Sequence, residues 1–241
     1  MKITGNKILI TGGASGIGLG LTEMFLSEKN SVIVCGRRKE ILEQLQQKHP
    51  SVVTRECDLS KEEERVRLFE WIKECHSDVN VLINNAGIQN WVTVEQEDFF
   101  SKAKNEIAIN IEAPIHLTSL FIKLNQLSTI MNVTSGLSFC PLTKVAVYSA
   151  TKAFFHSFTM SMKKELEAKN IEVIELIPPA INTDLGGKGL HDYAPPVSEL
   201  IASIYNQLKE GKTTLTFGMS DAMSKAGPEQ IQIAFDRMNN Q

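Results

Sequence analysis

The sequence predicts an α/β fold in which a doubly wound parallel sheet of about seven strands carries helices on both faces. Short β-branched runs alternate with longer amphipathic stretches along the chain, an order typical of parallel strands joined by helices. The run Val32-Ile33-Val34 is apolar throughout, as in strands that are buried on both sides. The 241 residues show no linker and no internal repeat, so we predict a single domain over residues 1–241.

The strands are predicted from short apolar runs that are rich in β-branched residues. They cover residues 7–11, 31–35, 52–57, 79–83, 128–133, 171–177 and 213–217. The helices are predicted from apolar residues at spacings of three and four. They cover residues 16–28, 39–48, 97–124, 148–168 and 197–210, and one more follows residue 60.

Two local features add detail to these elements. Ser60 and Glu63 have the spacing of a capping box, which predicts that Ser60 caps the third helix. The stretch 184–196 is rich in Gly and Pro, and we predict that it is a mobile loop over the substrate region.

The composition excludes several classes of protein. A net charge of −3 argues against a general nucleic-acid-binding surface, which requires a basic face. The four cysteines form no C-x-x-C pair and no residue cluster has metal-ligand spacing, so we predict reduced thiols and no metal. No apolar run reaches about 18 residues and no signal peptide is recognisable, so we predict no membrane association and a cytoplasmic location.

Tyr148 and Lys152 lie four residues apart in a predicted helix, which places both side chains on one face. A nearby ammonium favours phenolate and lowers the tyrosine pKa from its usual value of about 10. A tyrosine tuned towards neutral pH can exchange a proton with a carbonyl or alcohol oxygen. This spacing is common by chance, but here Ser135 also ends an apolar run thirteen residues upstream.

A glycine-rich turn lies between the first predicted strand and the first predicted helix. Gly12, Gly16 and Gly18 permit a tight turn and let the backbone approach a pyrophosphate closely. The helix N-terminus then presents free N–H groups and a positive dipole end to phosphate. The turn predicts a phosphate-binding site, although its spacing differs from Gly-x-Gly-x-x-Gly, and the alternative is a tight strand–helix turn without a ligand.

Together these motifs resemble the short-chain dehydrogenase/reductase family over nearly the whole chain. The matching residues, in the family's order, are Thr11-Gly12-x-x-x-Gly16-x-Gly18, Asp58-Leu59, Asn84-Asn85-Ala86-Gly87, Asn110, Ser135, Tyr148-x-x-x-Lys152 and Pro179 to Thr183. Within the family, segments 113–117, 132–137 and 235–239 are most similar to the DltE-type oxidoreductases. The resemblance implies a Rossmann-type NAD(P)-binding domain and an oxidoreductase that acts on CH–OH donors.

The resemblance also implies roles for four catalytic residues. Tyr148 is expected to act as the acid in reduction and the base in oxidation, with its pKa lowered by Lys152. Ser135 is expected to polarise the substrate carbonyl, and Asn110 to hold a water beside Lys152. No metal is expected, because the hydride moves directly between nicotinamide and substrate carbon.

The cofactor residues follow from the same resemblance. The expected cofactor-binding set is Gly12, Ser15, Gly16, Ile17, Gly18, Arg37, Arg38, Asp58, Leu59, Asn85, Ala86, Gly87, Tyr148, Lys152, Pro179, Ala180, Ile181 and Thr183. Within this set, Asp58 and Leu59 are expected at the adenine, and Ile181 and Thr183 at the nicotinamide carboxamide. Asn84 is expected to tie strands together. The family usually has Pro-Gly where this chain has Pro179-Ala180.

The end of the second strand bears on the choice between the two nicotinamide cofactors. NAD-using relatives place an acid where this chain has Gly36, while Arg37 and Arg38 can bind a 2′-phosphate through forked hydrogen bonds. We therefore predict NADP(H) in preference to NAD(H). Ser15 weighs against this, because many NADP(H)-using relatives have a basic residue in that loop. Alternatively, both arginines are solvated residues at the start of the next helix.

The leading hypothesis is an NADP(H)-dependent oxidoreductase that interconverts a carbonyl (aldehyde or ketone) and an alcohol. The alternatives are a non-catalytic nicotinamide-dinucleotide-binding redox sensor or scaffold, and a sugar-nucleotide epimerase or dehydratase. We expect a small-molecule substrate, and a homodimer or homotetramer formed through helices 97–124 and 148–168. A mostly apolar substrate pocket is predicted from Trp91, Phe139, Leu142, Leu185, Leu190 and Tyr193.

Overall fold

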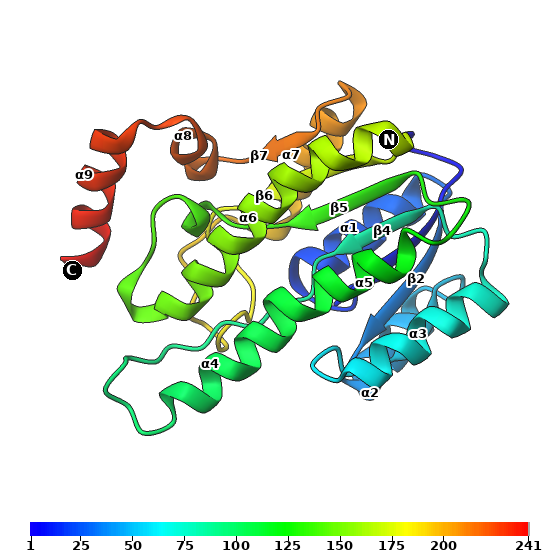
Figure 1. The fold of residues 1–241 in the computed structure, drawn as a ribbon, viewed down its shortest axis with the longest axis horizontal. Helices are drawn as coiled ribbons and strands as arrows, with labels where there is room; N and C mark the ends of the chain where they lie inside the picture. Colours follow the sequence, from blue (N-terminus) through cyan, green and yellow to red (C-terminus); the bar gives the residue numbers. More distant parts are fainter. Residues whose placement is uncertain (241) are drawn as a thin grey trace.

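The computed structural model describes residues 1–240 and contains one seven-stranded sheet in which every strand pairing is parallel. The strand order is β3-β2-β1-β4-β5-β6-β7 (Figure 1). The strands are β1 (Lys7–Thr11), β2 (Ser31–Gly36), β3 (Val53–Glu56), β4 (Val81–Asn84), β5 (Thr129–Val133), β6 (Glu172–Ile177) and β7 (Thr214–Thr216). The predicted single-domain, doubly wound parallel sheet is confirmed.

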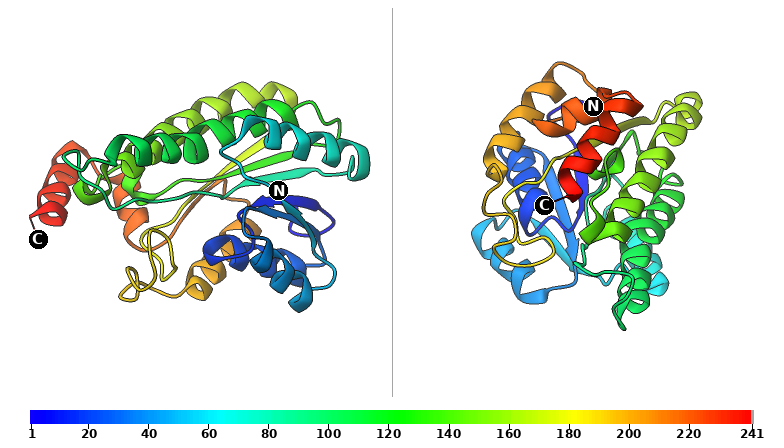
Figure 2. Two further views of the ribbon diagram at one scale, coloured as in Figure 1. Left: turned by 90° about the horizontal axis from the view of Figure 1, so that it is seen from below. Right: turned by 90° about the vertical axis from the view of Figure 1, so that its left-hand side faces the viewer.

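Helices form a layer on each face of the sheet, which Figure 2 shows from two further directions. One layer contains α1 (Gly16–Ser27), α2 (Lys39–Lys48) and α7 (Val197–Lys209). The other contains α3 (Glu62–Cys75), α4 (Phe99–Ile107), α5 (Ala113–Phe121) and α6 (Ala146–Leu166). None of the helices within residues 1–240 combines the length and apolar composition that crossing a lipid bilayer requires.

The strands alternate between two apolar clusters, one on each face of the sheet. Ile8 and Ile10 of β1 pack with α1 and α7, whereas Leu9 between them packs with α3 and α5. Since successive side chains of a strand point to opposite faces, each strand needs apolar residues at consecutive positions. This requirement explains the unbroken apolar runs of the central strands.

The long helix predicted over 97–124 is interrupted in the middle. Residues Ala108–Glu112 form a π-helical segment that joins α4 to α5. Such segments are rare and often occur at functional sites, because the extra residue in the turn shifts the following side chains. Asn110 lies inside this segment and is buried.

The prediction that Ser60 caps the third helix is wrong. The helix α3 begins at Glu62 with Lys61 at the N-cap position. The Ser60 hydroxyl instead donates a hydrogen bond to Asp58 Oδ1 at 2.7 Å, and the Ser60 N–H donates to the same oxygen. The carboxylate of Asp58 therefore holds Ser60 in a turn, one residue before the N-cap position of α3.

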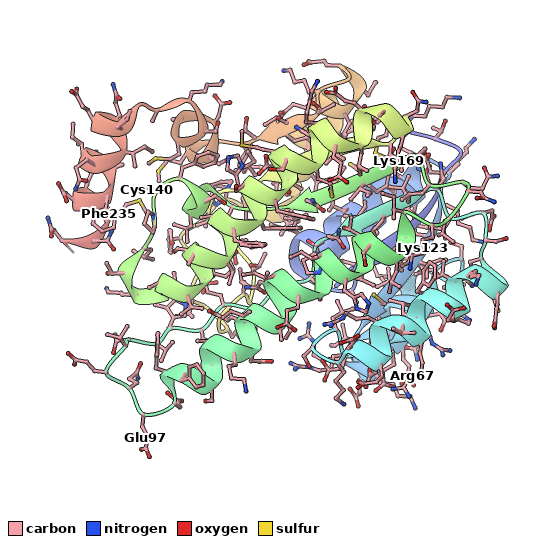
Figure 3. All side chains as sticks on the ribbon, viewed as in Figure 1. Arg67, Glu97, Lys123, Cys140, Lys169 and Phe235 are labelled. Carbon is pink, nitrogen blue, oxygen red and sulfur yellow. The ribbon has the colours of Figure 1, made fainter. Side chains whose placement is uncertain are left out.

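Two helices at the C-terminal end were not predicted from the sequence. They are α8 (Met219–Lys225) and α9 (Pro228–Asn239), and no residue of α9 is fully buried. Figure 3 shows Phe235 of α9 on the side of the helix that faces Cys140. Met238 Sδ lies 3.6 Å from Cys140 Sγ, so α9 packs against the segment that precedes α6.

Candidate active site

The glycine turn between β1 and α1 is held tightly against the loop that follows β4. A side chain at Gly18 would overlap the carbonyl oxygen of Gly12 and the Asn85 amide, and Gly12 has a φ of +64°. The first N–H groups of a helix have no intrahelical partner. In α1 the side chain of the N-cap residue Ser15 does not bind them either. These N–H groups lie on the cleft and can bind a phosphate.

The loop that follows β4 is fixed to the glycine turn at one end and to the π-helical segment at the other. The N–H groups of Asn85 and Ala86 both donate to Thr11 Oγ1 at 3.0 Å. The Ile88 N–H donates to Asn110 Oδ1 at 2.9 Å, and Asn110 Nδ2 donates back to the Ile88 carbonyl at 2.9 Å. The course of residues 85–88 is thereby determined from both sides.

The side-chain amide of Asn110 has a protein partner at each of its two polar atoms. Besides Ile88, its Nδ2 donates to Thr151 Oγ1 at 3.1 Å, which ties the π-helical segment to α6. Within residues 1–240, Oδ1 accepts only from Ile88, so one of its two lone pairs is left over. That Asn110 holds a water beside Lys152 stays a prediction.

Tyr148 and Lys152 lie one turn apart near the start of α6 and are both buried. The Lys152 Nζ donates to the carbonyl oxygen of Val133, the last residue of β5, at 2.8 Å. The same Nζ lies 5.6 Å from the centre of the Tyr148 ring. Ser135 follows β5 two residues later, and its hydroxyl accepts a hydrogen bond from the Leu137 N–H. These three side chains therefore meet at the carboxyl end of β5.

Burial is the largest influence on the pKa values of Tyr148 and Lys152. It raises the pKa of the Tyr148 phenol above its usual value; the Ser135 hydroxyl opposes this rise and the charge of Glu106 adds to it. Burial also lowers the pKa of Lys152 from 10.5 to about 8. In the protein without a ligand, burial is therefore the largest influence on the phenol, and it raises the pKa. That Lys152 lowers the pKa of Tyr148 stays a prediction.

Glu106 is a residue of this site that sequence reasoning missed. It is 1% exposed, and its carboxylate accepts a hydrogen bond from the Asn90 N–H. Burial raises the pKa of Glu106, although the hydrogen bonds from Asn90 lower it. The sequence feature that could have revealed Glu106 is its place as a single acid among apolar residues, four residues before Asn110.

Two arginines and an aspartate surround the other end of the cleft. Arg38 donates to Ser15 Oγ at 2.9 Å, so the second strand and the glycine turn meet at this point. Burial alone would raise the pKa of Asp58, but hydrogen bonds from Ser60 and the charge of Arg37 hold it below its usual value. Asp58 is therefore ionised at neutral pH and can accept hydrogen bonds.

All these elements line one cleft of about 1370 Å³, which exceeds the roughly 300–1,000 Å³ usual for a drug-sized ligand. The cleft is large enough for a dinucleotide together with a small substrate. The residues predicted from the sequence that line it are Gly12, Ser15, Gly16, Ile17, Gly18, Arg37, Arg38, Asp58, Leu59, Asn85, Ala86, Gly87, Tyr148, Lys152 and Thr183. The donors and glycines present therefore fit a nicotinamide dinucleotide.

Some predicted residues do not line the cleft. Pro179, Ala180 and Ile181 lie outside its lining, and the Ile181 side chain is packed in the apolar core. Ser135 and Asn110 are also outside the lining: Ser135 Oγ accepts from the Leu137 N–H, and Asn110 is hydrogen-bonded to the main chain of Ile88. Of the six apolar residues predicted for the substrate pocket, only Leu185 lines the cleft. Asn84 ties strands together as expected, since its Nδ2 donates to Asn132 Oδ1 on β5 at 3.0 Å.

The lowered pKa of Lys152 predicts a cost in stability. A shift from 10.5 to about 8 corresponds to about 3 kcal/mol, at about 1.36 kcal/mol per unit. Lys152→Met should therefore raise the free energy of unfolding by up to about 3 kcal/mol at pH 7. The gain should shrink as pH rises from 8 and vanish above 10.5, where lysine is neutral in both states. Urea denaturation across this pH range measures the free energy of unfolding of both proteins. A lower value for Lys152→Met than for the unmodified protein at pH 7 would contradict the unfavourable burial of the Lys152 charge.

Comparisons with known proteins agree with this geometry. The family model described as short chain dehydrogenase matches residues 6–194. The chain is 37% identical to the uncharacterised oxidoreductase DltE of Bacillus subtilis (strain 168), over 100% of this chain and 99% of the relative. It is 30% identical to carbonyl reductase family member 4 of Danio rerio, over 73% of this chain and 76% of the relative.

A solved structure has the same fold along almost the entire chain. The short-chain dehydrogenase of Burkholderia cenocepacia J2315, solved in complex with NADP, superposes with a TM-score of 0.85 at 26% identity. The match covers 99% of both chains. With a family match over most of its length and a relative of 37% identity, the chain belongs to the short-chain dehydrogenase family, oxidoreductases that act on CH–OH donors with NAD(P).

Proposed function

We propose that this oxidoreductase interconverts an aldehyde or ketone and the corresponding alcohol with NADP(H), through Ser135, Tyr148, Lys152 and Asn110. The observation that carries the proposal is the buried Tyr148 phenol on the cleft, with the Ser135 hydroxyl and the Lys152 ammonium on either side. When bound, nicotinamide supplies or accepts the hydride.

In reduction, the Tyr148 hydroxyl donates a proton to the oxygen of the substrate. Its raised pKa keeps the phenol protonated at neutral pH, which suits a general acid. Ser135 donates a hydrogen bond to the same oxygen, since its hydroxyl lies close enough to Tyr148 to oppose the rise in the pKa of the phenol. Lys152 supplies a positive charge that favours the phenolate left behind, and Asn110 holds the loop beside it in place.

The preference for NADP(H) rests on Arg37 and Arg38. Both line the cleft beside Ser15, and the neighbouring Gly36 adds no carboxylate that would repel a 2′-phosphate. Planar guanidinium groups bind phosphate through two parallel hydrogen bonds. The Burkholderia relative was solved with NADP, which supports the same choice.

Two other functions have less support. A non-catalytic redox sensor or scaffold would need neither a buried Tyr148 nor a buried Lys152, yet the chain keeps both, and burial of the Lys152 ammonium is unfavourable. A sugar-nucleotide epimerase or dehydratase is disfavoured by the short chain and the glycine spacing of the turn.

We further propose a homodimer or homotetramer that forms through α4, α5 and α6. Phe100 on α4 is 72% exposed, and Phe154 and Met160 on α6 are 44% and 58% exposed. The helices α4 and α6 are in contact, and exposed apolar side chains on neighbouring helices are typical of an interaction surface. An interface between copies of the chain would bury them.

Tyr148→Phe should lower the rate of NADPH-dependent carbonyl reduction by about 10²–10⁴, the range typical for loss of a general acid. The ring remains, so folding and NADPH binding should be unchanged. Steady-state kinetics on an aldehyde and ketone panel, with NADPH fluorescence for binding, measure both. Tyr193→Phe is the matched control, because Tyr193 is 80% exposed and away from the cleft. Near-normal turnover of Tyr148→Phe would refute the proton-donor role.

The cofactor preference has its own test. Calorimetric titration should show NADPH binding at least about 10-fold tighter than NADH, which is about 1.4 kcal/mol. Arg37→Ala should weaken NADPH much more than NADH, because only NADPH carries the 2′-phosphate. Equal affinities in the unmodified protein, or an NADH preference, would contradict the proposal.

A further inference from the structure

Gln89 places a buried hydrogen-bond acceptor in the cleft without a donor from the described chain. The side chain is 7% exposed, and its Oε1 has no hydrogen-bond partner among residues 1–240. Buried side-chain oxygens are paired in the large majority of cases. Since Gln89 lines the same cleft as Tyr148 and Lys152, its missing partner can come from a bound molecule.

The position of Gln89 is fixed on the substrate side of the cleft. A methyl group at Gly87 would lie 3.7 Å from Lys152 Nζ, so this loop passes directly beside the proposed catalytic group. Ile88 is then tied to Asn110 by two hydrogen bonds. Gln89 is the next residue, and the Asn90 N–H after it donates to Glu106, so the main chain is held on both sides of Gln89.

The loop over 184–196 closes on the Gln89 amide from the opposite side. A Cβ atom at Gly186 would lie 2.9 Å from Gln89 Oε1 and 2.9 Å from Trp91 Nε1. Gly186 also has a φ of +80°, which favours glycine on conformational grounds. Glycine at position 186 therefore lets the main chain of the loop come close to the Gln89 amide without a side chain between them.

The chemistry of the missing partner follows from the oxygen itself. An amide oxygen only accepts, so its partner must donate a hydrogen bond. A hydroxyl group on a bound molecule meets this requirement, whereas a hydrocarbon group does not.

Building on the proposed carbonyl–alcohol chemistry, we propose that the substrate is a hydroxy ketone or hydroxy aldehyde whose hydroxyl is recognised by Gln89. The hydroxyl lies one or two carbons from the reacting carbonyl, and reduction yields a diol. The carbonyl carbon gains the hydride from NADPH and its oxygen gains the Tyr148 proton. The recognised hydroxyl forms and breaks no covalent bond, so Gln89 determines specificity and takes no part in the hydride step.

Matched ketone pairs test this proposal. Hydroxyacetone and butanone differ only by a hydroxyl in place of a methyl group, as do 4-hydroxy-2-butanone and 2-pentanone. With NADPH, the unmodified enzyme should favour the hydroxylated member of at least one pair by about 10-fold or more in kcat/KM, since a site built to bind a hydroxyl rejects the analogue without one. An equal or higher kcat/KM for both methyl analogues would overturn the proposal.

Gln89→Met keeps the length of the side chain and removes the acceptor. The hydroxyl preference should fall to within about 3-fold of unity, mainly through loss of activity on the hydroxylated ketone. Leu185→Met, in the opposite wall of the cleft, is the matched control and should change both members of a pair alike. NADPH fluorescence and thermal melting check that each variant is folded. If the hydroxyl preference survives in Gln89→Met, another residue recognises the hydroxyl and the role proposed for Gln89 is wrong.

Binding measurements separate this proposal from the proposed function. If the unmodified enzyme reduces none of the four ketones, the carbonyl–alcohol assignment fails for this class while the subsite is still tested. Ligand-observed NMR with the NADP-loaded protein should then show selective broadening of the hydroxylated ketones, and Gln89→Met should remove it. Equal broadening within each pair, or none, would overturn the subsite.

Discussion

The hydrogen bond from the buried Lys152 ammonium to the carbonyl oxygen of Val133 connects the main parts of the site. It joins α6, which carries Tyr148, to the end of β5, from which the chain continues to Ser135. A charged group in such a place is costly, as the lowered pKa of Lys152 shows. A neutral side chain would be more stable there, so the lysine is best explained by chemistry.

The same burial sets the role of Tyr148. A phenol removed from water and close to the carboxylate of Glu106 holds its proton more firmly than a free tyrosine. In the proposed reduction, Tyr148 would give this proton to the substrate, and the positive charge of Lys152 would favour the phenolate that forms. Glu106 also accepts the Asn90 N–H, so one carboxylate influences both the acid and the loop that carries Gln89.

Much of the fold was predictable because each central strand must bury side chains on both faces. The unbroken apolar runs at Ile8 to Ile10 and Val32 to Val34 follow from that requirement, and the glycine turn follows from its close packing on Asn85. The π-helical segment around Asn110 was not predictable from periodicity, because it is confined to Ala108–Glu112, whereas a helical pattern is recognised over several turns. The C-terminal α9 was missed although Ile231, Phe235 and Met238 recur at helical spacing, and in the structure none of its residues is fully buried.

The site could be located from the sequence, but its electrostatics could not. Spacing placed Tyr148 and Lys152 on one face, whereas the pKa of each depends on desolvation by residues distant in the chain. Likewise, Ile181 fits the family's order of motifs, yet its side chain is in the core. The unpartnered amide of Gln89 became visible only when Gly186 was brought against it in space.

The most direct test of this account is a pH titration of Tyr148 by NMR. The chain has three tyrosines, so 13Cζ-labelled tyrosine gives few signals, and Tyr148→Phe identifies the one of interest. In the protein without added cofactor, the Tyr148 signal should remain that of the phenol beyond the usual tyrosine pKa of about 10. A Tyr148 signal that titrates near neutral pH would contradict the claim that burial governs the site.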